Sequence, residues 1–97
     1  MNEGFTLEQT DTHCVVGGTL DFTTARRALD KMSPLVQSGE LRQISFDGVT
    51  ECNSAALALM IEVKGLALRS GHDLVFHDIP EGLQQLAKVC QVDGFIN

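Results

Sequence analysis

Basic residues are scarce in this chain and are not gathered into a patch. Seven lysines and arginines stand against thirteen aspartates and glutamates, which gives a net charge of −6. Proteins bind nucleic acid mainly by neutralising phosphates with basic side chains, so this composition argues against a nucleic-acid partner. Anionic membrane surfaces are disfavoured for the same reason. A partner protein with a basic surface suits the chain better.

Long apolar runs are missing too. The longest unbroken one covers residues 55–61 and is far shorter than the ~20 residues of a membrane-spanning helix. The first residues contain neither a basic segment nor an apolar one, so no signal peptide is predicted. We therefore expect a cytoplasmic protein without direct membrane insertion, linked to a membrane only through a partner.

Cysteine and histidine motifs are absent. Cys14, Cys52 and Cys90 form no CxxC pair, and the three histidines belong to no HExxH. Widely spaced cysteines of odd number are typical of reduced thiols in a cytosolic protein. We predict no metal site and no bound cofactor.

Catalytic motifs are absent as well. The sequence has no phosphate-binding glycine motif and no GxSxG nucleophile elbow. His72-Asp73 and His77-Asp78 flank a predicted strand and could form a metal or proton-relay pair, although solvated strand-end residues explain them better. Asp21 fits a turn or a helix cap. The chain is therefore predicted not to be an enzyme.

Short strands and helices follow one another in what we interpret as a single domain, residues 1–97. Hydrophobic residues make up 43% of it, enough for one compact core. Alternating apolar segments predict strands, and apolar residues three or four apart predict helices. The expected strands are 5–8, 13–16, 41–46 and 74–76. The first expected helix is capped by Thr23 or Thr24 and breaks at Ser33-Pro34, where Ser33 caps a second piece that ends at Gly39. The other expected helices are 54–69 and 80–90.

The order β-β-α-β-α-β-α predicts an α/β fold. Strand–helix–strand crossovers give parallel pairing, while the initial hairpin adds an antiparallel strand. We therefore expect a mixed β-sheet with helices packed mainly on one face. Gly17-Gly18 should end or bend the second strand, and residues 47–52 should form a loop. Phe95-Ile96 should tuck back against the sheet.

A hydroxyl followed by an apolar run marks the start of the helix 54–69. Ser54 lies at the junction of loop and helix, where a side chain can cap backbone N–H groups. The run 55–61 is apolar on every side of the helix, whereas a helix on a sheet buries only one stripe. Either the flanking helices cover the rest, or an exposed apolar patch binds another protein.

Polar residues return after this run, which places the expected interaction at the N-terminus of the helix. Glu62, Lys64 and Arg69 are expected to face solvent. The predicted partner-binding residues are Asn53, Ser54, Ala55, Ala56, Leu57 and Met60.

Five segments follow one another in an order that is distinctive as a set. They are GTLD at 18–21, ISFDGV at 44–49, CNSAALAL at 52–59, GHDLVF at 71–76 and IPEGLQQLA at 79–87. Together they resemble the STAS domain (sulfate transporter and anti-sigma factor antagonist) over nearly the whole chain. The resemblance implies a mixed sheet with helices, and partner binding through the junction around Ser54.

The anti-sigma antagonists of this family carry Asp-Ser-Ser/Thr-Gly at the junction, and a partner kinase phosphorylates the second hydroxyl. Here Asn53 replaces the aspartate, Ala55 the phosphoacceptor and Ala56 the glycine. The resemblance therefore implies that the usual switch cannot operate, with Ser54 as a possible substitute phosphoacceptor.

Within the family, Ser54-Ala55-Ala56 followed by Leu57-Ala58-Leu59-Met60 is most similar to the MlaB-type branch. That resemblance implies a cytoplasmic accessory subunit bound to the ABC ATPase of a phospholipid transporter at the inner membrane. An anti-sigma factor antagonist in a partner-switching pathway is the alternative. A third interpretation, a module that binds a small molecule, predicts a pocket near Ser54.

Overall fold

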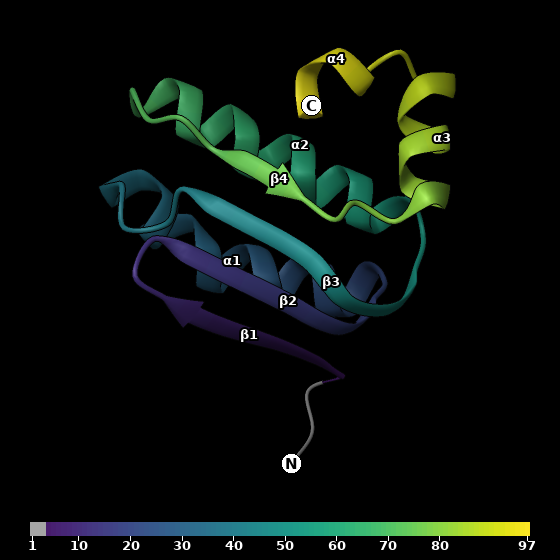
Figure 1. Cartoon of the computed structure of the whole chain (residues 1–97), viewed down its shortest axis with the longest axis horizontal. Helices are drawn as coiled ribbons and strands as arrows, with labels where there is room; N and C mark the ends of the chain where they lie inside the picture. The colour runs from purple at the N-terminus through teal and green to yellow at the C-terminus, as the bar shows by residue number, and fades with distance from the viewer. Residues whose placement is uncertain (1–3) are drawn as a thin grey trace.

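A computed structural model describes residues 4–97 of the chain. Within that range four strands form one sheet in the order β1-β2-β3-β4; β1 is antiparallel to β2, and the other pairs are parallel. Figure 1 shows α1 and α2 side by side on one face of the sheet, with α3 and α4 beyond α2. The elements are β1 (Phe5–Thr10), β2 (His13–Leu20), α1 (Phe22–Ser38), β3 (Gln43–Cys52), α2 (Ser54–Arg69), β4 (Val75–His77), α3 (Glu81–Val89) and α4 (Asp93–Ile96).

This architecture confirms the predicted fold class, a mixed sheet built from a hairpin and parallel strands with its helices mainly on one face. The core lies between the sheet and α1 and α2. Ile44 and Phe46 of β3 are buried there, and the rings of Phe46 and Phe76 meet edge to face with centroids 5.7 Å apart. Ser45, on the other face of β3, is also buried, and its hydroxyl donates to Asp78 Oδ2 at 2.8 Å.

Helix α1 begins one residue after Asp21, which is its cap. The Asp21 carboxylate accepts from the backbone N–H groups of Thr23 and Thr24 at 2.9 and 3.0 Å, and Thr24 Oγ1 accepts from Asp21 N at 2.8 Å. This reciprocal pair is a capping box. The cap role expected of Asp21 is confirmed, whereas the expected cap at Thr23 or Thr24 is wrong. The Thr24 N–H holds the pKa of Asp21 below its ordinary value.

The predicted break at Ser33-Pro34 is also wrong, because α1 continues through both residues. Proline removes one backbone hydrogen bond, to the carbonyl of Asp30 four residues earlier. Asp30 and Pro34 are both exposed, so water can satisfy that carbonyl. Ser33 does not cap a new helix; its hydroxyl donates to the Leu29 carbonyl at 2.6 Å. Gly39 ends the helix as expected, in the left-handed conformation.

Strands β2 and β3 are longer than predicted. Residues 47–52 belong to β3 rather than to a loop, and Gly17-Gly18 lies within β2. The register shifts at Val15/Gly17 and at Gly18/Thr19, so the glycines bend β2 without ending it. A Cβ on Gly48 would lie 3.0 Å from Gly17 Cα, which shows how closely the two backbones approach there.

The strain at this bend gives a stability prediction. Gly18 has φ +85°, and a Cβ there would lie 2.5 Å from the Gly4 carbonyl oxygen. We expect Gly18→Ala to lower the free energy of unfolding by ~1–3 kcal/mol, measured by urea denaturation. Gly82→Ala is the control, since nothing lies within 4 Å of its added Cβ in α3. It should stabilise the helix by ~0.5–1 kcal/mol, and equal losses for both variants would contradict the strain argument.

Two further expectations are corrected around α2. Lys64 does not extend into solvent: it is half-buried, its Nζ donates to the Leu74 carbonyl and lies 5.6 Å from the Phe76 ring centroid. The C-terminal tail forms α4, which packs against α2 and α3 rather than on the sheet. Ile96 is buried there, while Phe95 is 37% exposed. The described residues include no helix with the length and apolar character needed to cross a membrane.

Candidate binding surface at the start of helix α2

The junction between β3 and α2 is held by the sheet on one side and by a cap on the other. Cys52 is the last residue of β3 and pairs with Leu20 of β2. Asn53 then caps α2: its side-chain oxygen accepts from Ala55 N at 2.8 Å, and its own N–H donates to the Leu20 carbonyl at 3.3 Å. Ser54 follows as the first helical residue and is exposed. The junction thus presents a hydroxyl on a rigid support.

The apolar run after Ser54 is largely covered by the chain itself. Ala55, Ala56, Leu57, Leu59 and Met60 are buried, and Ile61 is half-buried. Helix α2 is the centre of the helical layer and contacts α1, α3 and α4, so its apolar surface meets neighbours on several sides. Of the two alternatives for this run, coverage by flanking helices holds for most of it. Within 55–61 only Ala58 is exposed.

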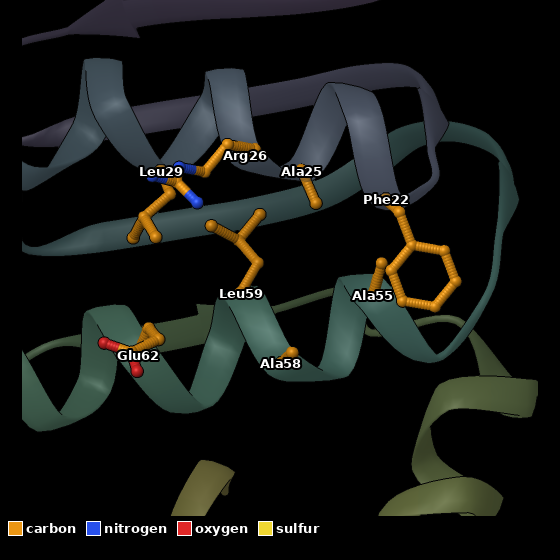
Figure 2. A pocket seen from close by; sticks show the side chains of 8 residues that line it. All are labelled: Phe22, Ala25, Arg26, Leu29, Ala55, Ala58, Leu59 and Glu62. Atoms are coloured by element: carbon orange, nitrogen blue, oxygen red, sulfur yellow. The ribbon is translucent and has the colours of Figure 1, made fainter.

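An apolar groove of about 270 Å³ lies between α1 and α2, next to Ser54. Figure 2 shows that the groove extends from Phe22 and Ala55 at one end to Leu29 and Glu62 at the other. We call it the α1–α2 groove. Its lining comprises Phe22, Ala25, Arg26 and Leu29 from α1, and Ala55, Ala58, Leu59 and Glu62 from α2.

Phe22 gives this groove an accessible aromatic side chain. It is the first residue of α1 and is 72% exposed. An aromatic ring buries a large apolar area when it packs against a partner, so an exposed phenylalanine is a candidate contact residue. Sequence reasoning missed it. The signal available was an aromatic residue directly after a capping aspartate, a position at the open end of a helix where the core does not reach.

The predicted site residues therefore divide into two groups. Asn53 and Ser54 are exposed at the junction and can meet a partner directly. Ala55 is buried yet lines the groove, whereas Ala56, Leu57 and Met60 point into the protein's own core. These three can support the surface but do not form its accessible part. A partner-binding role for the whole set stays a prediction.

The histidines lie elsewhere, and His72 and His77 have hydrogen-bond partners whereas the buried Nε2 of His13 has none. A ring nitrogen of His77 lies 3.0 Å from Gln43 Oε1, and one of His72 lies 3.1 Å from the Gln37 carbonyl oxygen. His13 stacks on His77 with ring centroids 6.1 Å apart, beside a polar hollow of about 400 Å³ near the β1–β2 turn. Among residues 4–97, no three His, Cys, Asp or Glu side chains are grouped so that they could hold a metal ion.

Comparisons with known proteins agree with the fold. The unphosphorylated form of the anti-sigma factor antagonist SpoIIAA has a TM-score of 0.72 and 15% identity, over 96% of this chain and 85% of that one. The phosphorylated form of the Bacillus cell fate determinant SpoIIAA has a TM-score of 0.71 and 15% identity, over 96% of this chain and 88% of that one. No curated protein matches the sequence.

The sequence model of one family matches almost the entire chain. The family is described as Mlab, STAS domain, and the match covers residues 4–97. It includes the capped start of α1, the Asn53–Ser54 junction and both walls of the α1–α2 groove. The chain belongs to the MlaB-type STAS domain family.

Proposed function

We propose that this protein is a non-catalytic accessory subunit that binds the cytoplasmic ABC ATPase of a phospholipid transporter and supports its assembly and activity. The observation that carries the proposal is the pairing of an exposed hydroxyl, Ser54, with an apolar groove in a chain of the MlaB-type family. Through that ATPase the protein would be held at the inner membrane from the cytoplasmic side.

The open shape and the chemistry of the surface support protein binding. The groove lies on the surface between two helices instead of enclosing a ligand. Its walls are mainly alanine, leucine and phenylalanine, with one basic and one acidic side chain. Such a hollow suits a few side chains of a partner better than an enclosed metabolite.

Affinity purification of the tagged chain from its native host tests the proposal. We expect an ABC ATPase and its permease to co-purify in fixed proportion with the wild-type chain. Recovery of a sigma-regulating kinase instead, without an ATPase, would contradict the proposal and favour the alternative.

An anti-sigma antagonist is the second candidate, because the fold is similar to SpoIIAA, which is known in unphosphorylated and phosphorylated forms. The junction argues against the usual switch, since Ala55 has no hydroxyl and Ser54 is the sole serine, threonine or tyrosine of α2. We expect mass spectrometry of native protein to find the peptide over residues 53–64 mostly unmodified. Stoichiometric phosphate on Ser54 would instead favour partner switching.

A further inference from the structure

We infer that the α1–α2 groove receives one amphipathic helix of the partner. Apolar side chains of that helix would fill the hollow, and charged ones would meet Arg26 and Glu62 on its two walls. The inference rests on the proposed function, since the partner is taken to be the ATPase. It adds which surface of this chain is covered and what kind of element covers it.

The end of the groove near Ser54 is built to accept apolar side chains. Ala25, Ala55 and Ala58 leave space between the two helices, and Phe22 stands beside that space with 72% of its surface exposed. Aromatic residues next to a small pocket are the usual anchors of protein interfaces, because their burial removes a large apolar area from water. This end of the groove should therefore contribute most to affinity.

The walls of the groove favour a helix over a strand as the occupant. Strand addition requires a sheet edge with available backbone N–H and C=O groups. Both walls here are helices, whose interior backbone groups bond within the helix itself. A helix is about 10–12 Å across, so the partner helix would lie along the groove and only its side chains would enter it.

The other end of the groove carries one charge on each wall. Arg26 on α1 pairs with Asp30, but the Nε–Oδ1 distance is 3.8 Å and both side chains are more than two-thirds exposed. Such a pair is weak, so Arg26 can turn to a carboxylate of the partner. Glu62 on α2 makes no ion pair with another residue of the described range. On the partner helix, an acidic residue facing Arg26 and a basic residue facing Glu62 would fix the direction in which that helix binds.

Binding of the purified ABC ATPase of the same host, measured by calorimetry or interferometry, tests the inference. We expect Phe22→Ala and Arg26→Glu each to weaken the Kd at least ~10-fold. Ala58→Gln, which fills the groove from an exposed position, should have a similar effect. The controls are Val89→Ala, an equally exposed apolar residue on α3, and Arg27→Glu, an exposed neighbour outside the groove. Both should change the Kd less than ~3-fold.

The outcomes separate the inference from the proposed function. Loss of affinity in the three groove variants, with unchanged melting temperatures and intact binding by both controls, supports the inference. If the wild type binds but Phe22→Ala, Ala58→Gln and Arg26→Glu behave like the controls, the groove is not the binding site for the ATPase. The inference then fails, while the proposed function stands. If the wild type does not bind the ATPase, both fail.

Discussion

We expect Ser54→Glu to abolish partner binding while the isolated protein stays folded. Ser54 is exposed at the first position of α2, where a carboxylate is favourable toward the helix N-terminus, so the fold should tolerate it. In the complex the same carboxylate would be buried without a partner charge, at a cost of ~2–5 kcal/mol. That corresponds to a loss of affinity of roughly 30-fold to several thousand-fold.

Thermal melting and partner co-purification, measured on the same preparations, check this result. Thr12→Glu is a suitable control, because Thr12 is an exposed hydroxyl residue in the β1–β2 turn, at the opposite end of β2 from the junction. It should bind as the wild type does. Ser54→Ala should melt like the wild type, because Asn53 rather than Ser54 provides the cap. Normal binding by Ser54→Glu would show that the junction is not part of the interface.

The second large effect concerns stability. Leu57 is 4% exposed and Met60 is fully buried, so we expect Leu57→Ala and Met60→Ala each to lower the free energy of unfolding by ~2–5 kcal/mol. Domains of this size are stable by only about 5–15 kcal/mol, so either change should lower the melting temperature by ten degrees or more. The reason is the cavity left between α2 and its neighbours.

Leu68→Ala supplies the matched control, since it is the same substitution in the same helix at a residue that is 56% exposed. It should cost less than about 1 kcal/mol. In denaturant unfolding, an unchanged slope of the unfolding free energy against denaturant concentration would verify that both variants unfold from the same folded state. If Leu57→Ala unfolded no more easily than Leu68→Ala, the assignment of this run to the core would be incorrect.

The sequence predicted most elements because they depend on local patterns. Helix α2 spans the expected 54–69, and Gly39 ends α1 where a glycine in the left-handed conformation was expected. The errors at residues 47–52 and at Pro34 have two different causes, namely strand pairing and solvent exposure, and neither can be read from the spacing of residues along the chain. Residues 47–52 look like a loop alone but pair with β2, and Pro34 looks like a break until its solvent-facing position is known.

The candidate site was predicted in position but not in composition. Ser54 and Asn53 were found because polar residues before an apolar run are a local signal, although the cap is Asn53 and not Ser54 as expected. Whether each residue of that run is covered depends on how α1, α3 and α4 surround α2, which spacing along one helix does not reveal. Phe22 was missed for the same reason, because its closeness to Ala55 arises only when α1 and α2 pack together.

The strand order of the sheet affects how the protein folds on the ribosome. Because β1, β2, β3 and β4 are neighbours in the order in which they occur along the chain, each strand meets a partner that has already been synthesised. Ribosomes add ~5–20 residues per second, which leaves time for the hairpin to form before β3 emerges. The growing edge of β3 is covered last, by the three residues of β4. A nascent chain stalled before Val75 would therefore expose that edge to other chains, and aggregation should be greatest at that length.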